Sequence, residues 1–229
     1  MEVTQVIKQS ILGLIDIFVD PESAVRCFDR KTAWALPFCI VGTGNILLGL
    51  ASLPILVRVV GNSFPVGTPE DQVHEIIDSI VKYQYIAIFL GPVGLLARWL
   101  FWALVLYMSC MLFDMDVTFD KLFSLIAQCS LITLLQDLVV FIIVKAQGDE
   151  IQTIADLSPK LGLDLLITTN NKAIMTIVKY FSAFNIWYIV VLVLGLSYLS
   201  GSSRMKALAA TIPIWFLQIG FLVELALFS

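Results

Sequence analysis

The sequence predicts an all-α integral membrane protein: a bundle of five transmembrane helices with an amphipathic N-terminal helix and interfacial helices. Two observations support this fold class. Of the 229 residues, 59% are hydrophobic and only 14% are charged, and the mean hydropathy of +0.92 lies far outside the range of soluble globular domains. The chain also contains five apolar runs of about 20 residues or more, the length that a helix needs to cross a bilayer.

Composition also limits the function classes. The net charge of -4 and the pI near 4.9 leave no basic surface for phosphate backbones, so we expect no nucleic-acid partner. The cysteines show no CxxC or Cys/His spacing, which favours small packing residues over a metal site: Cys27, Cys39, Cys110 and Cys129. His74, the only histidine, lacks the partners that a metal site needs. We therefore expect neither a metal nor a cofactor.

Two short helices are predicted before the first span. Residues 3–19 place one apolar stripe at helical spacing, which indicates an amphipathic helix that lies on the membrane surface or packs under the bundle. Asp20-Pro21-Glu22 then carries helix-start signals and predicts a short charged helix to about Lys31. Its polar side chains form a candidate cytoplasmic interaction surface of Asp20, Glu22, Arg26, Arg30 and Lys31.

The chain divides into two parts on this basis. Residues 1–33 form an amphipathic, cytoplasmic N-terminal segment, and residues 34–229 form a five-span membrane domain. No stretch between the apolar runs is long enough to bury a separate core. We therefore predict a single membrane domain.

The first span is expected over residues 34–57. It contains a series of glycines that allows close helix contact, Gly42, Gly44 and Gly49. Thr68-Pro69-Glu70 then starts another helix, whose one-sided apolar residues predict a course along the membrane interface. Gly91-Pro92 follows as an expected kink or re-entry before the second span.

Two charged residues mark the centre of the chain. Arg98 is the only formal charge in the apolar run of residues 86–113, and Asp137 is the only one in residues 122–144. An arginine near the middle of hydrocarbon costs about 2.5–3.5 kcal/mol on insertion scales, so it needs an anion or water. Both residues are nearly equally far from the turn at residues 114–121, which places them at one depth in a helical hairpin. We therefore predict that Arg98 and Asp137 pair.

The last two spans follow a segment of mixed polarity. Residues 161–168 are weakly apolar but contain Asp164, so we expect them at the interface. The fourth and fifth spans are predicted over residues 180–199 and 206–228, joined by a basic turn. This turn and an acidic loop at residues 61–82 favour an N-terminus in the cytoplasm and a C-terminus outside.

Three blocks resemble the Yip membrane-protein family, named for interaction with Ypt/Rab GTPases. The first is the DP-acid opening that leads through a basic, tryptophan and proline entrance, seen here as Asp20-Pro21-Glu22, Arg30-Lys31, Trp34 and Leu36-Pro37. The second is Gly91-Pro92-Val93-Gly94 with the following span to Tyr107. The third is Phe184-Asn185-Ile186-Trp187 with Gly195-Leu196 and the basic turn Ser202 to Ala207.

The chain also departs from the family pattern. Thr32 stands where a proline commonly follows the lysine, and Cys129-Ser130-Leu131-Ile132 replaces the usual tyrosine-alanine and later proline. The N-terminal tail is short, unlike the long cytosolic tails of eukaryotic members that act in vesicle trafficking. The resemblance therefore implies a bacterial-type member in the inner, or cell, membrane, and it supplies neither a biochemical role nor Rab binding.

Two functions are compatible with these features. The first is a non-enzymatic organiser or adaptor that binds lipid, another membrane protein or a second copy of itself. No HExxH, GxSxG or P-loop motif occurs, so we expect no enzyme. The alternative is a small channel, transporter or lipid-moving protein with an internal polar site around Arg98 and Asp137. The candidate buried polar site comprises Arg98, Asp137, Gln128, Gln136, Asn45 and Asn185.

Overall fold

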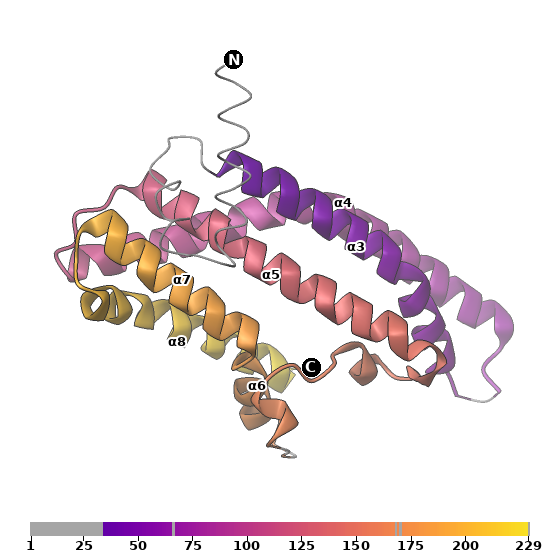
Figure 1. Cartoon of the computed structure of the whole chain (residues 1–229). Coiled ribbons are helices and arrows are strands. Elements are labelled where there is room, and N and C mark those ends of the chain that lie inside the picture. Colours follow the sequence, from indigo (N-terminus) through magenta and orange to yellow (C-terminus); the bar gives the residue numbers. More distant parts are fainter. Residues whose placement is uncertain (1–33, 66, 168, 170, 229) are drawn as a thin grey trace. The chain divides into compact units, whose positions relative to one another are not determined.

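The computed structural model describes residues 34–229 apart from residues 66, 168, 170 and 229 (Figure 1). This part of the chain is built from helices, five of which are long and apolar enough to cross a membrane. They are α3 (Ala35–Asn62), α4 (Glu70–Leu112), α5 (Phe119–Gln147), α7 (Ala183–Ser200) and α8 (Arg204–Phe228). The predicted all-α, five-span class is confirmed. The two predicted helices within residues 1–33, with their interaction surface, lie outside the described residues.

The connection between α5 and α7 contains only short elements. Three 3-10 turns, η1 (Gly148–Glu150), η2 (Ile154–Leu157) and η3 (Leu163–Leu165), precede the short helix α6 (Lys172–Tyr180). The Asp156 carboxylate accepts hydrogen bonds from the backbone and hydroxyl of Thr153 and from the backbone of Gln152. These bonds to the charged form lower the pKa of the exposed Asp156 carboxyl. The described residues of the weakly apolar stretch, 161–167, do not belong to a helix long enough to span a membrane.

Helix α4 differs most from the sequence-based expectation. We predicted an interfacial helix, a kink or re-entry at Gly91-Pro92 and then a separate span, whereas α4 is helical without a break from Glu70 to Leu112. Its start after Pro69 is as predicted. A break in hydrocarbon would leave several backbone groups without partners, whereas a proline inside a continuous helix removes only one bond. Pro54 in α3 and Pro213 in α8 also lie inside continuous helices.

The chain forms two compact units. Among the described residues, the first unit comprises residues 34–40, 96–133 and 160–229, and the second comprises residues 41–95 and 134–159. Helices α3, α4 and α5 contribute residues to both units. Each unit is described separately below.

The first unit has a core of residues repeated every three or four positions. On α4 these are Trp99, Ala103, Leu106 and Cys110, and on α5 they are Leu122, Ile126 and Cys129. Helices α7 and α8 lie side by side (Figure 1) and bury Leu192, Leu196, Ala210 and Ile214. Alternating three- and four-residue steps keep one face of each helix against its neighbours.

Aromatic rings pack around Trp99 in the first unit. The Trp99 ring lies edge to face with Phe38 and Phe123, with centroids 6.1 Å and 6.2 Å away. Trp34, immediately before α3, contacts Phe123 at 5.7 Å between centroids. These rings link the start of α3 to α4 and α5.

The second unit packs α3 closely against its neighbours. A Cβ atom at Gly44 would lie 2.7 Å from a methyl carbon of Leu134, so glycine lets α3 approach α5 here without displacing this side chain. The predicted role of the glycine series in close helix contact is confirmed at this position. Val59, Val144 and Ile151 form a buried cluster, and Arg58 Nη2 donates a hydrogen bond of 2.6 Å to the Gly148 carbonyl.

Candidate functional site

The first unit contains a small polar pocket of about 90 Å³. By the volume share of a liquid water molecule, this is room for about three waters or for a group the size of a phosphate. The buried Trp99 lines this pocket, and its Nε1 hydrogen has no acceptor among the described residues. We call this pocket the polar recess; it is lined by Arg98, Trp99, Trp102, Ile126, Ser130, Thr133, Asn185, Tyr188 and Gln218.

A larger groove of about 830 Å³ shares four lining residues with the polar recess: Arg98, Trp102, Asn185 and Gln218. Its remaining walls are mainly apolar. We call it the apolar groove, and its other lining residues are Phe101, Tyr180, Phe216, Leu217, Gly220, Phe221, Leu222 and Glu224. One cation, one carboxylate and two amides therefore meet a wide apolar surface in this unit.

Hydrogen bonds fix the amide side chains at this site. Ser182 caps the N-terminus of α7 by accepting from the Asn185 backbone N–H, 3.2 Å. The Asn185 Nδ2 atom then donates to the Tyr180 carbonyl, 2.7 Å, and the Tyr180 hydroxyl donates to Gln218 Oε1, 2.5 Å. Burial raises the pKa of the Tyr180 hydroxyl from 10.0 to about 12. The hydroxyl is therefore protonated at neutral pH and remains a donor.

We expect Tyr180→Phe to lower the free energy of unfolding by about 1 kcal/mol, because it removes the bond to the part-buried Gln218 amide. The measurement is a denaturation midpoint of the purified protein in detergent. The matched control is Tyr198→Phe, since Tyr198 is 54% exposed. The stability from the Tyr180 hydroxyl should be constant below pH 10.0, where both states keep the proton. It should be lost as the pH rises from 10.0 to about 12, because the unfolded chain ionises first. An equal effect of the two variants would contradict this role of Tyr180.

Contacts between α4 and α8 define which residues lie level with Arg98. The Ser109 hydroxyl donates to the Ala210 carbonyl, 2.6 Å, and Lys206 Nζ donates to the Asp114 carbonyl, 3.2 Å. The helices are thus antiparallel. Arg98 lies eleven residues before Ser109, and Phe221 lies eleven residues after Ala210, so these two residues are at one level. Glu224 is about one helical turn from this level.

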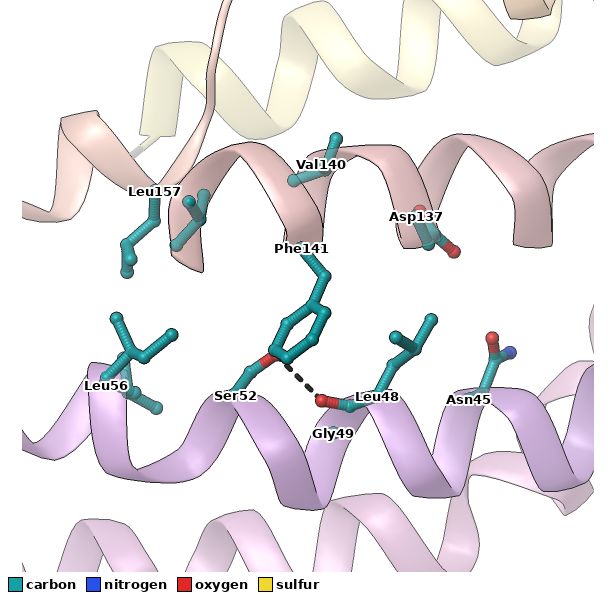
Figure 2. Close-up of a pocket in the computed structure, with 11 residues that line it drawn as sticks. Asn45, Leu48, Gly49, Ser52, Leu56, Asp137, Val140, Phe141 and Leu157 are labelled. Carbon is teal, nitrogen blue, oxygen red and sulfur yellow. Dashed lines mark hydrogen bonds between the residues drawn. The ribbon is translucent and has the colours of Figure 1, made fainter. Parts of the chain in front are cut away.

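A separate pocket of about 420 Å³ lies in the second unit. It is bounded mainly by apolar side chains of α3 and α5, and its polar lining residues are Asn45, Ser52 and Asp137. Figure 2 shows the side chains of Asn45 and Asp137 directed into the space between these two helices. The Ser52 hydroxyl is used within α3, where it donates to the Leu48 carbonyl, 2.7 Å.

Comparison with protein-family models decides to which family the chain belongs. The Yip1 domain matches residues 15–225, nearly the whole chain. The chain belongs to the Yip1 domain family. The resemblance inferred from the three sequence blocks is therefore confirmed, and the family match agrees with the apolar, membrane-spanning helices. Neither curated proteins nor solved structures gave a match.

The predicted polar residues of this Yip1 domain fall into different places. Arg98 and Asn185 meet at the polar recess, whereas Asn45 and Asp137 line the pocket of the second unit. Gln128 is buried in α5, and Gln136 is half-buried one residue before Asp137. Cys110 and Cys129 are buried and Cys39 is exposed. No group of three potential metal ligands occurs within the described residues.

Sequence reasoning missed several residues of the site. Trp102, Tyr180, Tyr188, Ser130 and Thr133 line the recess or the groove but were not among the candidates. Gln218, inside the last predicted span, was expected to line an internal polar site with Arg98 and Asn185, and Glu224 was the next candidate partner of Arg98 after Asp137. The available signal was position: Asn185 lies sixteen residues before Gly201 and Gln218 seventeen residues after it, which places both at one level of a helical hairpin.

The pairing of Arg98 with Asp137 stays a prediction, since Arg98 belongs to the first unit and Asp137 to the second. If they pair, Arg98→Leu and Asp137→Leu should each lower the free energy of unfolding by about 3–5 kcal/mol, because each leaves one charge without its partner. The double variant should then recover much of this loss. Losses that simply add in the double variant would show that the residues act independently.

Proposed function

We propose that this Yip1 domain protein is a non-enzymatic organiser or adaptor that binds a lipid or another membrane protein. The observation that carries the proposal is the polar recess beside the apolar groove. Side chains there are fixed by hydrogen bonds to their neighbours, as expected for a site that selects a ligand by shape and charge. Large apolar side chains next to it are exposed, including Phe101 at 53% and Phe216 at 75%, and offer surface to lipid chains or to a partner helix.

We further propose that the membrane is the bacterial cell membrane and that the N-terminal segment faces the cytoplasm. The acidic loop at residues 61–82 and the basic turn between the last two spans support this orientation. The polar residues from Asp20 to Lys31 would then be available to cytoplasmic partners. Cysteine labelling in whole cells should place residue 31 inside and residue 75 outside; labelling of residue 75 from the cytoplasm would reverse the orientation.

The test of the proposed function is to extract the full chain in native nanodiscs and to identify co-purifying molecules by mass spectrometry. The proposal expects a lipid or membrane protein in stoichiometric amount, including a second copy of the chain as one outcome. A parallel flux assay in liposomes checks the alternative. Solute flux or lipid transfer that depends on the protein, without any stable partner, would contradict the organiser role and favour a channel or transporter.

A further inference from the structure

The recess and the groove together have the shape and chemistry of an amphiphile. The recess holds room for a phosphate-sized group, and the groove is about nine times larger, with phenylalanine and leucine side chains on its walls. Four residues belong to both spaces, so a headgroup in the recess would continue into a chain in the groove. This inference rests on the proposed function and names the class of its ligand.

The recess presents hydrogen-bond donors. Arg98 contributes a guanidinium, and Trp99 contributes an indole N–H that is buried and has no acceptor within the described part of the chain. The hydroxyl hydrogens of Ser130 and Thr133 are used on backbone carbonyls of α5, at 2.9 Å and 2.7 Å. A buried donor without an acceptor is costly, and a guanidinium binds phosphate through two parallel hydrogen bonds. A phosphate group supplies the missing acceptors.

The groove adds a carboxylate. Glu224 lines the groove together with Arg98, so the site carries one positive and one negative charge. Within the described residues, no hydrogen bond or ion pair joins these two side chains. A ligand with its own phosphate and ammonium group would match both charges, whereas a purely anionic ligand would be repelled by Glu224.

The depth of the site in the membrane matches the depth of a lipid headgroup. Helix α7 has 18 residues and is therefore about 27 Å long, close to the hydrocarbon thickness of about 30 Å. Asn185 lies two residues inside its start, and the bonds from Tyr180 place Gln218 at the same level. The site therefore lies near the membrane boundary opposite the Gly201 turn. This differs from the expected position of Arg98 near the middle of hydrocarbon.

We propose that the first unit binds one phospholipid with a primary-amine headgroup, such as phosphatidylethanolamine. Arg98 and the Trp99 indole N–H bind the phosphate, and the Gln218 amide adds a hydrogen bond. Glu224 accepts hydrogen bonds from the ammonium group. The acyl chains lie along Phe216, Phe221 and their neighbours in the groove.

The experiment is native mass spectrometry of the full chain in detergent, titrated with phosphatidylethanolamine, phosphatidylcholine or phosphatidylglycerol. Wild type should retain phosphatidylethanolamine best, because a quaternary ammonium cannot donate a hydrogen bond and glycerol carries no positive charge. Arg98→Gln should weaken binding of every phospholipid about tenfold or more. Glu224→Gln should remove the preference for phosphatidylethanolamine over phosphatidylglycerol while binding persists.

The matched controls are Lys172→Gln and Glu70→Gln, which remove exposed charges outside the site. Neither should change lipid retention. Equal retention of the three lipids by wild type, or an unchanged preference in Glu224→Gln, would overturn the proposal. Displacement of the lipid by inorganic phosphate alone would also overturn it, because the site would then be a simple anion site.

A stability measurement in lipid-free detergent separates a direct Arg98–Glu224 pair from lipid binding. The proposal expects phosphatidylethanolamine to raise the denaturation midpoint of wild type and not of Arg98→Gln. Strong coupling between the two substitutions without lipid, and no stabilisation by lipid, would overturn it. If lipid selectivity is absent while a membrane protein still co-purifies, the lipid inference fails and the organiser function stands.

Discussion

Gly195→Ala should destabilise the first unit, although glycine to alanine in a helix ordinarily stabilises. A Cβ atom at Gly195 would lie 2.3 Å from Leu125 Cδ1, well inside van der Waals contact. Leu125 is fully buried between neighbouring side chains of the core and has little room to move away. Overpacking of this kind costs about 1–3 kcal/mol, which exceeds the gain of about 0.5–1 kcal/mol in helix propensity. The measurement is the denaturation midpoint in detergent.

Gly94→Ala is the matched control for this prediction. Gly94 also lies inside a helix, α4, and a Cβ atom there would meet nothing within 4 Å. Only the propensity gain remains, so this variant should be neutral or slightly more stable than wild type. Similar midpoints for the two alanine variants would show that α7 and α5 are not in close contact at Gly195.

Most of the helix limits that were predicted from local sequence signals agree with the structure. Pro69 precedes α4 as a start signal, and Gly201 ends α7 with a backbone φ of 63°, which glycine adopts without strain. The expected spans at residues 180–199 and 206–228 agree with α7 and α8 within a few residues. Hydropathy and capping residues act over one or two helical turns, so a single sequence contains the information that sets where a helix begins and ends.

The buried faces could not be predicted in this way. In a membrane protein the side chains that face lipid are as apolar as those of the core, so hydrophobic periodicity does not distinguish the two. Small residues were the remaining signal. Ala103, Ala207 and Ala210 are fully buried, whereas Leu112 is 80% exposed and Phe216 is 75% exposed. Gly91-Pro92 predicted a kink or re-entry, whereas α4 continues through it, because the continuity of a helix at a proline depends on its surroundings.

The candidate site was predicted only in part, because its residues come from five helices, α4 to α8. Equal distance from a connecting turn was used to place Arg98 and Asp137 at one depth, and these residues line different pockets. The same criterion, applied to the hairpin of α7 and α8, would have placed Asn185 beside Gln218. Tyr180 was the first residue of the predicted fourth span but was not counted among the polar residues. It ends α6, and its role depends on the turn that positions it.

That turn depends on one glycine, and Gly162→Ala is expected to disrupt it. A Cβ atom at Gly162 would lie 2.5 Å from the Phe181 carbonyl oxygen and 2.7 Å from the Ser182 Cα atom. Both are backbone atoms, so no side-chain rotation relieves the overlap. The two segments must separate, which breaks the Leu163 N–H to Phe181 carbonyl bond of 3.2 Å and the bridge between Gly162 and Ser182.

We expect Gly162→Ala to affect the candidate site as well as the stability of the fold. Tyr180 and the cap residue Ser182 flank Phe181, so a shift there moves the Tyr180 hydroxyl away from Gln218 and loosens the start of α7. We expect Gly162→Ala to cost about 1–3 kcal/mol of unfolding free energy and to weaken retention of phosphatidylethanolamine. Asp164→Asn is the comparison, because the asparagine oxygen still accepts from the Gly162 N–H, 2.8 Å in wild type. If Gly162→Ala is no less stable than Asp164→Asn, the close approach of these segments does not position the site.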